Sequence, residues 1–111
     1  MKHLEETIKL LNHIQENPES TQRELMNKVD MSLGKVNFLI KALIEKGIIK
    51  IQRFKNSRSK MAYLYLITPK GIKQKAEITR DFLKAKLEEY GKLKKKIEML
   101  SQAVDDTGAN G

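Results

Sequence analysis

The sequence of 111 residues contains no cysteine and has no long apolar run. Without cysteine it cannot form a disulfide framework, a thiolate nucleophile or a cysteine-ligated zinc site. No stretch approaches the ~18 consecutive apolar residues of a membrane span. Charged residues follow Met1 almost at once, so we expect no secretory signal, no membrane partner and a cytoplasmic location.

Catalytic and cofactor motifs are also missing from the sequence. There is no Walker loop and no dinucleotide fingerprint. His3 and His13 lie on one predicted helix with no acidic pair at a metal-ligand spacing. Ser20 and Ser32 have no general base placed beside them, and both fit helix caps. We therefore predict that the chain is not an enzyme and binds no metal or cofactor.

Positive charge is present in excess and is concentrated in the middle of the chain. The net charge is +8, and residues 32–61 hold eight Lys or Arg against one Glu. Residues 1–31, by contrast, hold four Lys or Arg against six acidic residues. A concentrated basic patch is typical of a protein that binds a polyanion, although a solvated surface is the alternative interpretation.

The hydrophobic periods of the first half predict three helices. The first has an apolar stripe at helical spacing, made of Leu4, Ile8, Leu11 and Ile14. Thr21 and Glu24 form a capping box for a second, short helix. Ser32 is a good N-cap for a third helix, which Gly47 ends. Because the turn between the second and third helices is so short, the two are expected to form a helix-turn-helix unit.

After the third helix the apolar period changes from about 3.6 to 2. Residues 48–54 and 62–68 are rich in Ile, Leu, Tyr and Phe, as strands are, and a basic loop separates them. Thr68 and Pro69 then open a last, long helix. The order predicts a mainly α-helical winged helix-turn-helix fold with a small β-hairpin, the wing, and a long C-terminal helix.

The last helix carries an apolar seam of the kind found in coiled coils. A helix of some thirty residues is ~45 Å long, more than a small domain can cover, so we expect it to pair with a second copy. Gly91 and the step from Tyr90 to Leu93 interrupt the spacing, which indicates a kink or a local shift of the seam. The predicted dimer-interface residues are Ile72, Ala76, Thr79, Phe82, Leu83, Leu87, Tyr90, Leu93, Ile97 and Leu100.

The expected domains are a winged-helix domain at 1–68, a dimerisation helix at 69–104 and a disordered tail at 105–111.

The third helix is the expected recognition helix, because the second helix of a helix-turn-helix enters the major groove. Lys can donate to guanine, Asn can bind adenine with two hydrogen bonds, and an aromatic ring can contact a thymine methyl group. Alternatives stay open: Gly34 could pack against the preceding helix, Asn37 could be solvated, and Phe38 could pack under the wing. The outward-facing candidates are Ser32, Gly34, Lys35, Asn37, Phe38 and Lys41.

The wing supplies a second set of candidate DNA contacts. Its basic side chains can reach phosphates or the minor groove, although a charged hairpin tip also discourages aggregation through sheet edges. The candidates are Arg53, Lys55, Asn56, Arg58 and Lys60.

Four segments carry a family resemblance: STQREL at 20–25, SLGKVNFL at 32–39, ALIEKG at 42–47 and YLYLITPKG at 63–71. They resemble the EPS-associated branch of the MarR family of transcriptional regulators. The resemblance implies a dimeric bacterial transcription factor. Many relatives have an extra N-terminal helix at the dimer interface, so here we expect the C-terminal helix alone to dimerise. Many also carry an Asp-Arg-Arg run where this chain has Ser59-Lys60-Met61. The wing arginine of those relatives has no counterpart here, and we expect Arg58 to take its place.

The function predicted from these features is sequence-specific binding of double-stranded DNA by a homodimer that represses transcription. The main alternative is a winged-helix protein-interaction module whose long helix docks a partner protein. RNA binding is a weaker alternative, because the aromatic platform and clamp loop of common RNA-binding modules are missing. The sequence leaves open whether a small-molecule effector exists.

Overall fold

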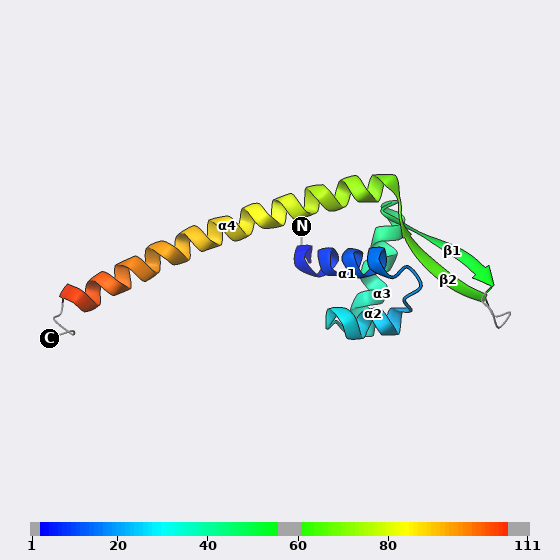
Figure 1. Ribbon diagram of the computed structural model, residues 1–111, viewed down its shortest axis with the longest axis horizontal. Coiled ribbons are helices and arrows are strands. Elements are labelled where there is room, and N and C mark those ends of the chain that lie inside the picture. Colours follow the sequence, from blue (N-terminus) through cyan, green and yellow to red (C-terminus); the bar gives the residue numbers. More distant parts are fainter. Residues whose placement is uncertain (1–2, 56–60, 107–111) are drawn as a thin grey trace. The chain divides into compact units, whose positions relative to one another are not determined.

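The computed structural model describes residues 3–55 and 61–106, which form four helices and one hairpin (Figure 1). The elements follow the predicted winged helix-turn-helix order. They are α1 (Leu4–Glu16), α2 (Gln22–Val29), α3 (Leu33–Glu45), β1 (Ile49–Lys55), β2 (Met61–Ile67) and α4 (Pro69–Asp106). The chain divides into two compact units, Met1–Thr79 and Arg80–Gly111, and each is described by itself.

The helix ends lie where the local sequence signals predict them. The Thr21 hydroxyl accepts a hydrogen bond from the Glu24 N–H at 3.1 Å, and the Ser32 hydroxyl accepts one from the Lys35 N–H at 3.1 Å. Each bond satisfies an N–H that the first turn of a helix leaves without a partner. Gly47 adopts a φ of 72°, the left-handed conformation that glycine tolerates best, just after α3 ends.

The core of the first unit lies between α1, α2, α3 and the base of the hairpin. The predicted stripe of α1 was partly wrong, because Leu4 and Ile8 are only half-buried while Thr7 and Leu10 are buried. The helix is rotated so that its other apolar row faces α2 and α3. The buried cluster comprises Leu10, Leu11, Ile14, Leu25, Val29, Met31, Val36, Leu39, Ile40, Leu43, Ile48, Ile49 and Tyr65.

The wing is an antiparallel hairpin whose strands lie within one residue of their predicted positions. Ile49 pairs with Ile67 at its base, and Arg53 pairs with Tyr63 further out. The Tyr65 N–H also donates to the Pro18 carbonyl at 3.0 Å, which ties the α1–α2 connection to β2. These bonds fix the base of the wing to the helical core.

The first unit includes the start of α4 and so extends past the predicted boundary at residue 68. The Thr68 hydroxyl accepts from the Gly71 N–H at 2.9 Å and donates to the Gly47 carbonyl at 2.5 Å. Gly71 is buried against the Ile48 carbonyl, where a Cβ atom would overlap the oxygen. Ile78, absent from the predicted core, is 6% exposed. The segment Thr-Pro-Lys-Gly therefore locks the first turns of α4 onto the domain.

The rest of α4 continues as helix through Gly91 and ends at Asp106, two residues beyond the predicted end of the helix at residue 104. Residues 107–111 of that predicted tail lie outside the described part of the chain. Among the described residues, no helix has the length and apolar character needed to cross a membrane.

Candidate nucleic-acid interface

The outer face of α3 carries an exposed apolar and basic surface. Phe38 is 61% exposed although it sits in the middle of the helix, and Lys41 is exposed one turn further along. Leu33, which the sequence interpretation left out, is 38% exposed on the first turn. None of these three side chains belongs to the core, and the exposed rings and methyl groups of Phe38 and Leu33 together with the Lys41 cation suit contact with a partner surface.

Gly34 lies on the same face and is open. A Cβ atom placed there would meet nothing within 4 Å, so the alternative that Gly34 packs against α2 is wrong. Phe38 lines a hollow of about 140 Å³ with Thr7 of α1 and with His3, the residue just before α1, and none of the residues that line this hollow comes from the wing. The interpretation that Phe38 packs under the wing therefore finds no support in the described residues.

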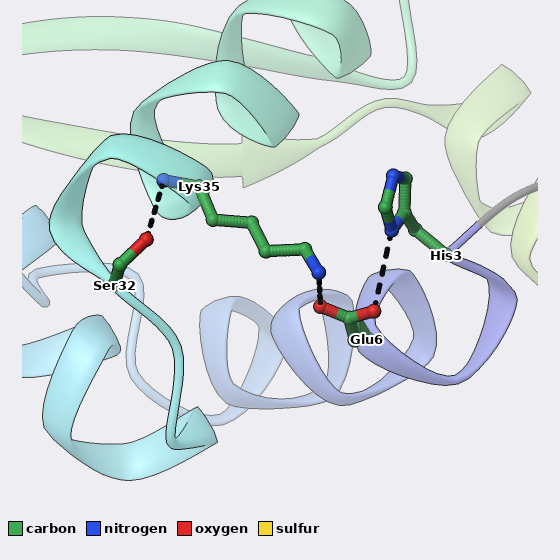
Figure 2. A network of polar contacts seen from close by, with 4 residues as sticks. All are labelled: His3, Glu6, Ser32 and Lys35. Carbon is green, nitrogen blue, oxygen red and sulfur yellow. Dashed lines mark hydrogen bonds and ion pairs between the residues drawn. The ribbon is translucent and has the colours of Figure 1, made fainter.

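Lys35, a predicted base-reading residue, is already bound within the domain. Its ammonium group forms an ion pair with the Glu6 carboxylate on α1, while its backbone N–H is held by Ser32 (Figure 2). His3 lies on the other side of the same carboxylate, with Nδ1 3.3 Å from Oε1. The hydrogen bond from Lys35 lowers the pKa of Glu6 below its ordinary value of 4.5. Lys35 thus joins α1 to the start of α3, and its cation is partly neutralised.

Asn37 is not a freely solvated side chain either. Its Nδ2 donates to the Gln22 Oε1 atom at 3.2 Å, and the Gln22 Nε2 atom donates to the Tyr65 hydroxyl at 3.4 Å. Asn37 and Gln22 are half-buried, and Tyr65 is 8% exposed. The alternative that Asn37 is merely solvated is therefore wrong. Sequence reasoning missed Gln22, because nothing in the local pattern predicts a bond between residues so far apart.

The described part of the wing presents two of its predicted cations. Arg53 lies over the Tyr63 ring, with 5.6 Å between the guanidinium carbon and the ring centroid, and Lys55 is exposed on the same strand. The cation–π contact limits the rotamers of Arg53 while leaving its donors available. Asn56, Arg58 and Lys60 lie outside the described residues.

A cleft of about 360 Å³ opens between the start of α2 and β2. The residues just before α2 and at its start form one wall, and residues of β2 form the other. The lining is partly polar. The lining residues are Glu19, Ser20, Thr21, Gln22, Ala62, Tyr63 and Tyr65. No group of His, Asp or Glu in the described part of the chain could hold a metal ion.

The predicted dimer-interface residues of the second unit lie uncovered along α4. The largest of them are 53–63% exposed: Leu83, Leu87, Tyr90, Leu93, Ile97 and Leu100. Phe82 is half-buried beneath Lys86, whose ammonium lies 5.3 Å from the ring centroid. In the first unit Ile72 is 57% exposed, and Ala76 and Thr79 are exposed too.

A regular seam appears when Lys86 is counted in place of Leu87. The steps then alternate between three and four residues without a break, so that neither a kink nor a shift at Gly91 is needed. Sequence reasoning passed over Lys86 because it is charged. We call this row the α4 seam: Leu83, Lys86, Tyr90, Leu93, Ile97, Leu100 and Val104.

Comparison with known proteins agrees with this fold. Residues 5–50 match the model of the winged helix-turn-helix DNA-binding family. That family binds DNA and is not a family of enzymes, in agreement with the sequence prediction. No protein of curated function matches the sequence.

The solved structures that resemble the chain include the following three. A protein of unknown function from Listeria innocua is 26% identical, with a TM-score of 0.53, and the match covers 76% of this chain and 55% of that one. MarR of Staphylococcus aureus, solved with salicylate and kanamycin, is 18% identical, with a TM-score of 0.56 and coverage of 86% and 67%. FabT of Streptococcus pneumoniae, solved with DNA, is 22% identical, with a TM-score of 0.52 and coverage of 90% and 74%.

This chain spans just over half the length of the Listeria innocua protein. At their identities, the MarR and FabT structures show a common fold and do not by themselves show a common activity. Together with the family match and the geometry of α2, α3 and the hairpin, they identify one module. The chain contains a winged helix-turn-helix DNA-binding domain whose fold resembles that of MarR-family transcriptional regulators.

Proposed function

We propose that this protein is a sequence-specific regulator of transcription that binds double-stranded DNA as a homodimer and acts as a repressor. The observation that carries the proposal is the outer face of α3, where Phe38 and Lys41 are exposed and Gly34 is open. A helix-turn-helix presents this face to the base edges of the major groove. The missing side chain of Gly34 allows the backbone to approach the duplex closely.

Charge supports the same proposal. Lys41, Arg53 and Lys55 are exposed cations on the recognition helix and the wing, and the chain has a net charge of +8. Neutralising phosphates releases counterions, which supplies affinity that does not depend on sequence. The side chains on α3 would then supply the choice of sequence.

The α4 seam supports the homodimer. An isolated helix gains nothing from a row of apolar side chains that are each more than half exposed, whereas a second α4 would cover them. Two copies would present two recognition helices to successive major grooves about 34 Å apart. Occupation of a promoter by such a dimer would block transcription. The alternative of a protein-interaction module rests on the same seam and predicts no preference for duplex DNA.

The placement in the EPS-associated branch of the MarR family rests on the four sequence segments alone. It extends the proposal to a bacterial regulator that works in the cytoplasm on genes near exopolysaccharide loci. Transcript profiling of a deletion strain would test it, and unchanged exopolysaccharide genes would contradict it.

The DNA proposal is tested by titrating the protein into labelled random duplex and into single strand over a series of salt concentrations. Lys41→Glu reverses one charge on the recognition face, and Lys84→Glu makes the same change on α4 as the matched control. Lys35→Glu is unsuitable, because it would place a second carboxylate beside Glu6.

We expect binding that prefers duplex and falls steeply with salt. Lys41→Glu should weaken duplex binding by about tenfold, the effect of losing one good contact to DNA. Lys84→Glu should have a much smaller effect. Equal binding of duplex and single strand, or equal losses in the two variants, would contradict the proposal and leave the basic surface as a solvated one.

A further inference from the structure

Three polar side chains from three different elements form one hydrogen-bonded row in the first unit. Asn37 comes from the middle of α3, Gln22 from the first turn of α2, and Tyr65 from β2. The Asn37 Nδ2 atom donates to the Gln22 Oε1 atom at 3.2 Å, and the Gln22 Nε2 atom donates to the Tyr65 hydroxyl at 3.4 Å. The row therefore connects the recognition helix to the wing through α2.

The row fixes which way the Asn37 amide points. A side-chain amide has one acceptor oxygen and two N–H donors, and rotation by half a turn exchanges them. Because the Gln22 oxygen can only accept, it holds the Nδ2 side of Asn37 towards α2. In the structure the Gln22 amide presents its oxygen to Asn37 and its nitrogen to the Tyr65 hydroxyl, so both ends of this amide have a partner in the row. Tyr65 is 8% exposed, so packing holds its ring in place.

The fixed amide keeps the groups that adenine requires. Asparagine recognises adenine by accepting from N6 through its oxygen and donating to N7 through an N–H. Gln22 uses one of the two N–H groups of Asn37, so the second N–H and Oδ1 stay available. A side chain that is already held in one orientation before binding loses less conformational entropy on complex formation than a side chain that is free to rotate.

We propose that Gln22 and Tyr65 are positioning residues that hold the Asn37 amide for adenine, so that discrimination at one base pair of each half-site depends on the Tyr65 hydroxyl. This inference rests on the proposed DNA-binding function. According to this inference, Asn37 contacts adenine directly. Tyr65 of β2 affects which base is preferred only through Gln22 and Asn37, and does not contact a base itself.

The test is a selection of bound sequences from a random duplex pool by the full-length protein and its variants. Tyr65→Phe removes only the hydroxyl, and Gln22→Ala removes the partner of Asn37. Tyr63→Phe, which removes a hydroxyl from the neighbouring wing residue, is the matched control. Thermal unfolding of each variant checks that the domain remains folded at the binding temperature. If Tyr65→Phe destabilises the domain, Gln22→Ala carries the test.

We expect the wild-type protein to prefer adenine at one position per half-site and Asn37→Ala to abolish that preference. Gln22→Ala and Tyr65→Phe should reduce it several-fold, within the roughly 5- to 100-fold that a two-bond contact provides, while other positions are unchanged. Tyr63→Phe should leave the preference intact. Adding Gln22→Ala to Asn37→Ala should cause no further loss at that position, because the row acts through Asn37.

Two results would overturn the inference while leaving the DNA-binding proposal intact. One is a full adenine preference in both Gln22→Ala and Tyr65→Phe. The other is an unchanged selected sequence in Asn37→Ala. If the wild-type protein enriches no duplex sequence at all, the sequence-specific function fails and this inference fails with it.

Discussion

Replacing Lys86 by leucine should strengthen association between two copies of the chain. Lys86 is the one charged member of the α4 seam, and the residues before and after it in the seam are Leu83 and Tyr90. In a monomer its ammonium pairs with Glu89 at 3.3 Å, with the two side chains 50% and 66% exposed. Pairing of two seams would bring this side chain into an apolar interface.

The size of the effect follows from the area that leucine would bury. Burial of one leucine side chain stabilises by about 1.5–3 kcal/mol, and each dimer contains two copies. The lost ion pair with Glu89 is exposed and contributes about 0–1 kcal/mol per copy. With the lower leucine value for two copies and the two lost ion pairs subtracted, the dimer gains about 1–3 kcal/mol, which lowers its dissociation constant by about 5- to 140-fold.

Sedimentation equilibrium over a range of concentrations measures this change directly. Lys84→Leu is the control, because it adds the same apolar side chain at an exposed position two residues away, off the seam. Leucine and lysine have similar helix propensities, so neither substitution should alter the helix itself. Equal dissociation constants for the two variants, or weaker association in Lys86→Leu, would refute the pairing of α4 seams.

The remaining predictions concern stability and base composition. Gly71→Ala should destabilise the domain by about 1–3 kcal/mol in chemical denaturation, because the new alanine Cβ atom would overlap the Ile48 carbonyl. Gly91→Ala should instead stabilise α4 by up to ~1 kcal/mol, because the space around Gly91 is open and alanine favours the helix. The lowered pKa of Glu6 means that its pair with Lys35 stabilises the fold above pH 4.5 and is lost as the pH falls through the lowered pKa. The melting temperature of Glu6→Gln should therefore fall below wild type at pH 7 and match it in acid; a constant gap would contradict this. Selected duplex sequences should be rich in A·T pairs, because the outer face of α3 carries apolar side chains that suit thymine methyl groups, and a G·C-rich consensus would contradict that.

Local sequence signals predicted most of the fold. The hydroxyls of Thr21 and Ser32 cap the helices that follow them, and Gly47 takes the left-handed conformation expected after α3. Each of these features depends on residues within one turn of the chain, so the sequence carries them directly. The change of apolar period from 3.6 to 2 likewise located both strands to within one residue.

The sequence patterns did not predict which residues of different helices and strands contact one another. On α1 two overlapping apolar rows satisfy the helical period, and only packing against α2 and α3 selects Leu10 over Ile8. The same limit applies at the candidate interface. Periodicity left Lys35 off the buried stripe of α3, but no periodicity shows that Glu6, on another helix, binds it.

The α4 seam and the recognition face depend on one another in the proposed mechanism. A single domain offers Lys41, Arg53 and Lys55 among its described cations, and three phosphate contacts give only weak, salt-sensitive binding. Joining two such domains makes the second binding event intramolecular, which can raise overall affinity by about 10²–10⁴-fold without any new contact to DNA. A variant with a tighter dimer, such as Lys86→Leu, should therefore bind a two-half-site duplex at lower protein concentration, while its affinity for a single half-site stays the same. The strength of the seam would then set the protein concentration at which the operator is occupied.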